Sequence, residues 1–210
     1  MQNQKEHTPM RGRFIVFEGI DGAGKTTQIE LLTKRLQGAG HRVYRTAEPT
    51  ESVSGGLLRD ALSGVSKRTA CEMAAMFVLD RIFHNTNPVN GIEKMLSDGV
   101  DVICDRYYYS SLAYQGSETD AEWVREMNLN CPEIRRPDLC IFLDLTPEQS
   151  MERIGKGRVT TEIYENTERL ERVRRQFYSV FETLKDSDRI CVVNAARTVE
   201  EIHEEIWKLI

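Results

Sequence analysis

Five short apolar runs recur along the chain, at residues 14–17, 42–46, 100–104, 139–143 and 190–193. Runs of this length are typical of buried strands, and the longer stretches between them have the apolar spacing of helices. A regular alternation of strand and helix predicts a parallel sheet covered by helices on both faces. We therefore expect a three-layer α/β fold with a five-stranded parallel sheet.

Several helix starts are marked by a Thr followed three residues later by Glu or Gln, which is the pattern of a capping box. Pro147 stands at a first helical position, where its missing N–H costs nothing. The stretch 163–185 is also expected to be helical. The predicted capping pairs are Thr69 with Glu72, Thr119 with Glu122, Thr146 with Gln149, and Thr198 with Glu201.

Composition and charge exclude some classes of function. The chain has 210 residues, of which 40% are hydrophobic and 29% charged, as in an ordinary enzyme. We expect a single domain at 13–210 after a polar, disordered tail at 1–12. The net charge of −5 argues against general nucleic-acid binding. No stretch is long or apolar enough to span a membrane, and the start lacks an apolar signal core, so we expect a cytoplasmic protein.

A glycine-rich segment directly after the first predicted strand fits G-x-x-x-x-G-K-[ST], the phosphate-binding loop. Glycines let successive backbone N–H groups point at a phosphate, and the following helix adds the positive end of its dipole. Such a pattern arises by chance in roughly one in a hundred chains of this size, given Gly at ~7% of residues. The predicted triphosphate-binding residues are Gly19, Ile20, Asp21, Gly22, Ala23, Gly24, Lys25, Thr26 and Thr27. The Thr26 hydroxyl is the expected ligand of the accompanying Mg²⁺.

Polar residues follow the other predicted strands, at the sheet edge where α/β proteins bind ligands. Asp105 is placed like a magnesium-holding acid, with a helix N-cap as the alternative. The planar guanidinium of Arg106 is suited to binding a phosphate. The alternative is that Asp105 and Arg106 form a structural ion pair on the surface. Glu18, Glu48-Pro49 and Asn194-Ala195 end the remaining strands.

Two further segments leave their alternatives open. Phe77 and Arg81 are spaced i,i+4, so they could stack on a base and donate to its carbonyl edge. A core Phe with an exposed Arg is slightly favoured by that spacing alone. The segment 153–164 is cationic and glycine-containing, which suits a flap that carries Arg153 or Arg158 to phosphates, or equally a plain solvated loop.

Taken together, these motifs closely resemble the thymidylate kinase family, nucleoside monophosphate kinases that make dTDP from dTMP and ATP. The resemblance runs from about residue 13 to the C-terminus. It is carried by Phe17-Glu18-Gly19-x-Asp21-Gly22-x-Gly24-Lys25-Thr26-Thr27, Phe77-x-x-x-Arg81, Asp105-Arg106-Tyr107-x-x-Ser110-x-x-x-Tyr114-Gln115-Gly116, Arg136-Pro137-Asp138 and Tyr164-Glu165-Asn166.

The resemblance implies a role for each matching residue. Phe77 would stack on thymine, Arg81 would donate to its O4, and Tyr114 would pack beneath the deoxyribose. Arg106 would hold the dTMP phosphate, with Glu18 and Asp105 organising Mg²⁺ and the acceptor end. Asn194 and Ala195 would border the adenine of ATP. The implied dTMP site also includes Glu48, Pro49, Arg59, Ser110, Ser111, Gln115 and Tyr164.

Catalytic cations follow from the same resemblance. Family members carry a catalytic arginine either in the phosphate loop or in the flap, and positions 20–23 of this loop hold none. We therefore expect the flap to supply it, with Arg158 first and Arg153 second, beside Lys25 and Arg106. Ala47 stands where the family often has an arginine, and Arg59 is expected to carry part of that phosphate contact. The resemblance also implies a homodimer.

Three other functions share part of this pattern. A kinase of the same architecture acting on another nucleoside monophosphate, or on a deoxynucleoside, shares most of the motifs. A GTP-dependent switch needs an Asn-Lys-x-Asp motif, and the chain contains no Asn-Lys pair. An ATP-gated interaction module would leave Phe77, Arg81 and Tyr114 without a purpose.

Overall fold

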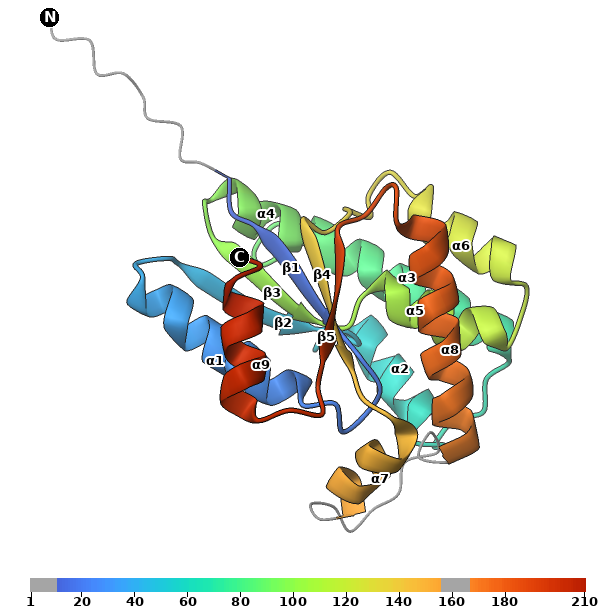
Figure 1. Ribbon diagram of the computed structural model, residues 1–210. Helices are drawn as coiled ribbons and strands as arrows, with labels where there is room; N and C mark the ends of the chain where they lie inside the picture. The colour runs from blue at the N-terminus through green and yellow to red at the C-terminus, as the bar shows by residue number, and fades with distance from the viewer. Residues whose placement is uncertain (1–10, 156–166) are drawn as a thin grey trace, which may run out of the picture.

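The computed structural model describes residues 11–155 and 167–210 (Figure 1). Its centre is a parallel sheet of five strands in the order β2-β3-β1-β4-β5. This confirms the predicted fold class, and each strand bound lies within one residue of its expected position. The strands are β1 (Phe14–Glu18), β2 (Val43–Ala47), β3 (Asp101–Asp105), β4 (Leu139–Asp144) and β5 (Ile190–Asn194).

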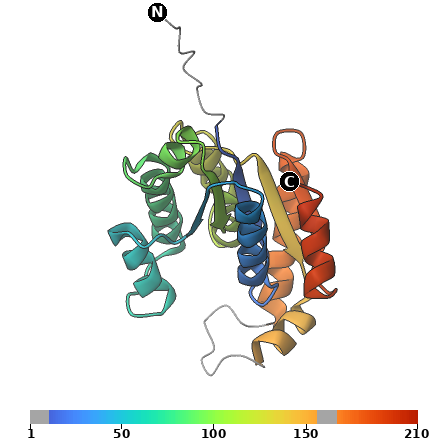
Figure 2. The same ribbon diagram turned by 90° about the vertical axis from the view of Figure 1, so that its left-hand side faces the viewer.

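Helices cover both faces of the sheet, as Figure 2 shows with α1 and α9 on the side toward the viewer. One core cluster joins the sheet to α1 and α9, and the other joins it to α3, α4, α5, α6 and α8. The helices are α1 (Lys25–Gly38), α2 (Val53–Leu62), α3 (Ala70–Thr86), α4 (Ile92–Ser97), α5 (Tyr108–Tyr114), α6 (Ala121–Leu129), α7 (Pro147–Gly155), α8 (Thr167–Leu184) and α9 (Val199–Trp207), with a short 3₁₀ turn, η1 (Gln115–Ser117).

The central strands contribute to both cores because successive side chains of a strand point to opposite faces. Phe14 and Val16 of β1 belong to the cluster with α8, whereas Ile15 and Phe17 belong to the cluster with α1. All four are at most 2% exposed. This burial on both faces explains why the sequence shows continuous apolar runs and not an apolar–polar alternation.

The predicted helix starts are confirmed with one correction. Thr69 and Thr198 form complete capping boxes, and Thr146 exchanges hydrogen bonds with Gln149 just before α7 begins at Pro147. The prediction for Thr119 is wrong. Asp120 caps α6 instead, by accepting from Trp123 N–H at 2.8 Å, because it lies directly before the first helical residue.

Two expected segments lie mostly outside the described residues, namely the tail at 1–12 and the flap at 153–164. Arg11 and Gly12 nevertheless contact the folded chain. Arg11 pairs with Asp138 at 3.1 Å, and Gly12 N–H donates to the Leu96 carbonyl at 2.9 Å. Within 11–155 and 167–210, no helix combines the length and apolarity that crossing a membrane requires.

Candidate active site

The segment between β1 and α1 adopts the backbone of a phosphate loop. Gly22 and Gly24 have φ values of +76° and +95°, a region that favours glycine. A Cβ on Gly19 would meet the Leu143 carbonyl at 2.8 Å, so β4 approaches the loop too closely for a side chain there. Helix α1 begins at Lys25 without a side-chain cap on Gly24, which leaves its first N–H groups directed at the loop.

Lys25 lies inside this loop and is only 8% exposed. Its Nζ donates to the Gly19 carbonyl at 3.0 Å and to the Ile20 carbonyl at 3.5 Å. Burial lowers the pKa of Lys25, and the neighbouring Arg106 cation lowers it further. Because both partners are neutral carbonyls, an anion entering the loop would supply the full negative charge that this buried cation favours.

Glu18 ends β1 beside the phosphate loop, as expected, and points into the protein interior. Its carboxylate is fully buried and accepts from Tyr107 N–H at 2.9 Å, Ser110 N–H at 3.1 Å and Ser110 Oγ at 2.7 Å. Burial raises its pKa, against the opposing effect of Arg106. Glu18 lines neither of the two cavities described below, and these hydrogen bonds attach it to the start of α5, so its expected roles toward Mg²⁺ and dTMP stay predictions.

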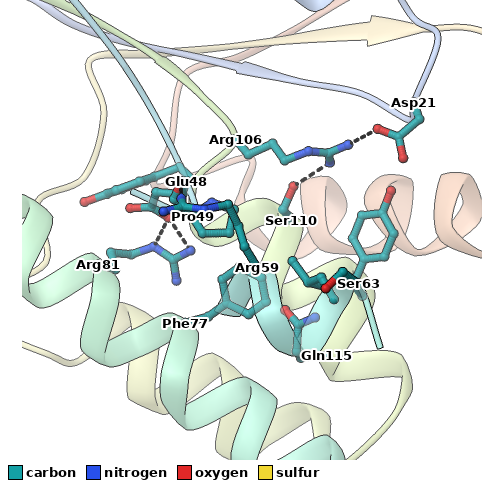
Figure 3. Close-up of a pocket in the computed structure, with 13 residues that line it drawn as sticks. Asp21, Glu48, Pro49, Arg59, Ser63, Phe77, Arg81, Arg106, Ser110 and Gln115 are labelled. Carbon is teal, nitrogen blue, oxygen red and sulfur yellow. Dashed lines mark hydrogen bonds and ion pairs between the residues drawn. The ribbon is translucent and has the colours of Figure 1, made fainter. Parts of the chain in front are cut away.

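Arg106 lies between the phosphate loop and α5 (Figure 3). Its Nη2 pairs with Asp21 Oδ1 at 2.6 Å, its Nη1 donates to Ser110 Oγ at 3.2 Å, and its guanidinium lies 5.7 Å from the Tyr114 ring centroid. The partner is Asp21 and not the adjacent Asp105, so the alternative of an Asp105–Arg106 surface pair is wrong. The residue holds a φ of +67°, which turns its side chain toward the loop.

A cavity of about 440 Å³ opens beside Arg106 and extends to α3. It is built by the loop after β2, by α2, α3 and α5, and by the phosphate loop. Leu62, Ser63 and Tyr107 line it in addition to the residues expected there. Tyr107 belongs to the Asp105-Arg106-Tyr107 motif, whereas no motif marks Leu62 or Ser63. The expected residues that line it are Glu48, Pro49, Arg59, Phe77, Arg81, Arg106, Ser110, Tyr114 and Gln115, together with Asp21 from the loop.

At the α3 end of this cavity, the burial of Phe77 and Arg81 is the opposite of what their i,i+4 spacing alone favoured. Arg81 is the buried residue, at 1% exposed, and Phe77 is only half-buried. Glu48 Oε2 accepts from Arg81 Nε at 2.9 Å and from Nη2 at 2.6 Å. The expectation for Ser111 is also corrected, because it does not line the cavity and instead accepts from Arg81 Nη2 at 3.2 Å.

Two polar residues near Arg81 were missed by the sequence analysis. His84 Nδ1 lies 3.0 Å from Glu48 Oε1, and its i,i+3 spacing from Arg81 on α3 was an available signal. Asn128 of α6 accepts from Arg81 Nη1, and nothing in the sequence connects these two residues. Together these contacts fix the Arg81 guanidinium at one end of the cavity.

The loop between β2 and α2 is anchored by Asp80, one residue before Arg81. The buried Asp80 carboxylate accepts from Thr50 N–H at 2.8 Å, Thr50 Oγ1 at 2.6 Å and Ser54 Oγ at 2.7 Å. Burial raises the pKa of Asp80, but these hydrogen bonds outweigh it and hold the pKa below its usual value. Arg59 donates to the Thr50 carbonyl at 2.5 Å, so the anchored loop also fixes Arg59 in the cavity wall.

A second cavity, of about 450 Å³, lies on the other side of the loop after β2. Thr26 and Asp105 both line it, as does Arg45. Asp105 Oδ1 is buried and has no hydrogen-bond partner among the described residues. The alternative of Asp105 as a helix cap is wrong, since Tyr107 is the residue before α5. A buried carboxylate oxygen and a hydroxyl-bearing residue that line the same cavity fit Mg²⁺, which is commonly bound by one or two protein oxygens together with phosphates.

The expected ATP-side residues at β5 lie beside α7. Arg153 Nη2 donates to the Ala195 carbonyl at 2.8 Å, and Asn194 Oδ1 accepts from Ala196 N–H at 2.9 Å. Ser150 Oγ donates to the Asp21 carbonyl, which ties α7 to the phosphate loop. Arg158 and Tyr164 lie outside the described residues.

The fold and these sites define a phosphate-loop α/β protein with a second pocket beside the loop, which is the organisation of a nucleoside monophosphate kinase. Residues 17–206 match the sequence model of the thymidylate kinase family. The chain belongs to this family, and it is a phosphotransferase of the nucleoside monophosphate kinase class.

Individual relatives cover nearly the whole chain. A probable thymidylate kinase from Pyrococcus horikoshii is 39% identical over 207 residues, which are 96% of this chain and 97% of that protein. A probable thymidylate kinase from Methanococcus aeolicus is 38% identical over 203 residues, covering 93% and 94%. A putative thymidylate kinase from Treponema pallidum is 33% identical over 196 residues, covering 92% of each.

Proposed function

We propose that this protein transfers the γ-phosphate of ATP to dTMP, giving dTDP and ADP, in the supply of dTTP. The observation that carries this proposal is the 440 Å³ cavity that runs from Arg106, beside the phosphate loop, to Arg81 and Phe77. A nucleoside monophosphate has a phosphate at one end and a base at the other. The cavity offers a cation suited to the phosphate, and an aromatic ring with a hydrogen-bond donor suited to the base.

In this proposal dTMP lies along the cavity. Arg106 binds its phosphate, Tyr114 packs beneath the deoxyribose, and Phe77 stacks on thymine while Arg81 donates to O4. A 2′-hydroxyl would collide with Tyr114, which favours deoxyribonucleotides. Pro49, Ser110 and Gln115 complete the wall, and Arg59 adds positive charge on the phosphate side.

The triphosphate of ATP occupies the phosphate loop, with Lys25 at its outer phosphates and Asn194 and Ala195 beside the adenine. Thr26 and Asp105 are the residues that would hold Mg²⁺, as the unpartnered Asp105 Oδ1 supports. When bound, the ion neutralises charge on the β- and γ-phosphates. Among the described residues no group of three or more His, Cys, Asp or Glu side chains is arranged for a metal. In this proposal, phosphate oxygens of ATP and water would complete the coordination, as is common for Mg²⁺.

Phosphoryl transfer requires that the protein position the two substrates and supply positive charge, and no protein side chain needs to form a covalent intermediate. In phosphoryl transfer, charge spreads over the oxygens of the moving group, and an oxygen of the dTMP phosphate attacks in line with the departing ADP. Lys25 and Arg106 approach this point from the loop and from β3. Because the loop contains no arginine, Arg158 is our candidate for the additional catalytic cation, with Arg153 second.

We propose further that the enzyme is a cytoplasmic homodimer. Leu79 and Phe83 are exposed by 59% and 45% on one face of α3, and Leu57 of α2 is exposed by 48%. Large apolar side chains gathered on neighbouring helices favour a protein interface. ATP and nucleoside monophosphates are cytoplasmic metabolites, and the buried thiols of Cys104 and Cys140 suit a reducing compartment.

Product analysis by ³¹P NMR tests the reaction directly. ATP, Mg²⁺ and dTMP incubated with the enzyme should yield equal amounts of dTDP and ADP. Thymidine in place of dTMP should leave ATP unchanged, because Arg106 then has no phosphate to bind. Formation of dTMP from thymidine would contradict the proposal, and release of free phosphate without dTDP would indicate an ATPase.

A further inference from the structure

The Arg81 guanidinium is enclosed by protein on three sides. Glu48 accepts from Nε and Nη2 (Figure 3), Ser111 accepts from Nη2, and Asn128 Oδ1 accepts from Nη1. A guanidinium carries five N–H groups, and these contacts use four of them. Within the described residues, the fifth N–H, on Nη1, is the one left for the cavity that Arg81 lines.

Asn128 holds the end of the guanidinium that carries this remaining N–H. It lies on α6, is 1% exposed, and donates from Nδ2 to the Val124 carbonyl at 2.8 Å, one helical turn earlier. This hydrogen bond orients the amide so that Oδ1, its acceptor, faces Arg81. Glu48 fixes only the opposite edge of the guanidinium, because its two contacts are made at Nε and Nη2.

We propose that Asn128 is a positioning residue that aims the last Nη1–H of Arg81 at position 4 of the pyrimidine, and thereby sets a preference for a carbonyl over an amino group there. The inference rests on the proposed function, since it takes dTMP as the acceptor. Thymine presents a carbonyl oxygen that can accept this hydrogen. Cytosine presents an amino group, so two donors would face each other in a buried place.

Three variants separate positioning from a merely structural role. Asn128→Leu has a similar volume but no acceptor, so the Nη1 end of Arg81 is released. Asn128→Asp loses the hydrogen bond to Val124 but keeps an acceptor, whose negative charge still orients it toward the Arg81 guanidinium. Val124→Ala lowers packing on the same helix, at a fully buried position, without changing a polar contact of Arg81.

The decisive readout is the ratio of kcat/KM for dTMP to kcat/KM for dCMP. We expect Asn128→Leu to raise the KM for dTMP about tenfold and to lower that ratio about tenfold, since a lost buried hydrogen bond has this size. The KM for ATP should not change, and Asn128→Asp and Val124→Ala should keep the wild-type ratio. If Asn128→Leu does not fold, Asn128→Ala removes the same acceptor and the same ratio decides.

The inference is overturned if Asn128→Leu keeps the wild-type ratio of kcat/KM for dTMP to kcat/KM for dCMP. It is also overturned if Asn128→Asp lowers that ratio as much as Asn128→Leu does. A wild-type enzyme that uses dTMP and dCMP equally would refute base reading by Arg81, and this inference with it, while leaving the kinase reaction intact. A wild-type enzyme without dTMP turnover would instead refute the proposed function itself.

Discussion

At the scale of single residues, Arg106 shows how the backbone prepares the site. Its φ of +67° is uncommon for a residue with a side chain, and such conformations concentrate at functional sites. The conformation brings the guanidinium to Asp21 of the phosphate loop and to Ser110 of α5. The cation proposed for the dTMP phosphate is therefore oriented by protein groups before substrate binds, which lowers the entropy cost of binding.

Lys25 is the single residue whose replacement should affect catalysis most directly. Its Nζ is buried against loop carbonyls, and its proposed role is to meet charge on the outer phosphates. We expect Lys25→Met to lower kcat by at least about 10³-fold, because removing a preorganised donor to developing charge has an effect of that order. Thermal unfolding should remain within a few degrees of wild type, since Met fills the same space without a desolvated charge. Activity near the wild-type level would exclude the loop from the mechanism.

At the scale of elements, the loop between β2 and α2 is held to α3 through Asp80. The carboxylate accepts four hydrogen bonds, one each from Thr50 N–H, Thr50 Oγ1, Ser52 Oγ and Ser54 Oγ. The same loop carries Glu48, which holds Arg81, and its Thr50 carbonyl accepts from Arg59. One buried carboxylate thus helps to position two cations, Arg59 and Arg81, in the wall of the cavity.

Asp80→Asn should destabilise the protein by about 2 kcal/mol at pH 7, because hydrogen bonds to a charged acceptor are lost. The folded-state pKa of Asp80 is lowered, so the stabilisation is present above the unfolded pKa of about 3.9 and is lost as pH falls through the folded value. The difference in unfolding free energy between wild type and Asp80→Asn should therefore be constant above about pH 5 and shrink at lower pH.

Urea unfolding at a series of pH values measures this difference. Asp98→Asn is the matched control, because Asp98 forms an i,i+4 surface pair with Lys94 and should contribute at most about 0.5 kcal/mol. A difference between wild type and Asp80→Asn that grows on acidification would contradict the proposed anchor.

Arg158 of the flap is expected to supply the catalytic arginine, because the phosphate loop contains none. Arg158→Ala should lower kcat by about 10³-fold, as losses of an arginine finger do, with little change in the KM for dTMP. Arg153→Ala is the comparison, since Arg153 already donates to the Ala195 carbonyl. A loss of only twofold in Arg158→Ala would transfer the role to Arg153 or Lys156. Single-turnover kinetics would show whether the chemical step itself is affected.

At the scale of the whole molecule, the exposed apolar face of α3 predicts self-association. Light scattering after gel filtration should give twice the mass of one chain. Phe83→Glu should shift the protein to a monomer, because dimer formation would then bury an unpaired carboxylate in the proposed interface, which is costly. Val199→Glu is the control, at a similarly exposed apolar position at the start of α9, where a carboxylate is favoured. A wild-type monomer would refute the proposed dimer.

The features that the sequence could predict are those carried by local patterns. The strands, the phosphate loop and the residues at strand ends follow from short runs and fixed spacings, and the family comparison confirms the resemblance drawn from them. Asp105 and Thr26 were placed together because carboxyl ends of parallel strands share one edge of the sheet.

The remaining features depend on partners far apart in the chain. Arg81 is buried because Glu48 and Asn128 reach it from 33 and 47 positions away, and no periodicity records such contacts. The metal role expected for Glu18 follows from its position at the end of a strand beside the loop. Its actual partners, Tyr107 and Ser110, lie about ninety positions later and appear only once α5 is packed against β1.

The proposed function requires that one cavity selects dTMP while ATP bound at the phosphate loop supplies the phosphoryl group. Steady-state kcat/KM values with ATP and Mg²⁺, measured separately for dTMP, dUMP, dCMP, dAMP, dGMP and thymidine, test it most directly. We predict the highest kcat/KM for dTMP, a much lower value for dCMP, and no turnover of thymidine. A higher value for any other monophosphate would refute the assignment of Phe77, Arg81 and Tyr114, and the absence of turnover with every acceptor would refute the kinase itself.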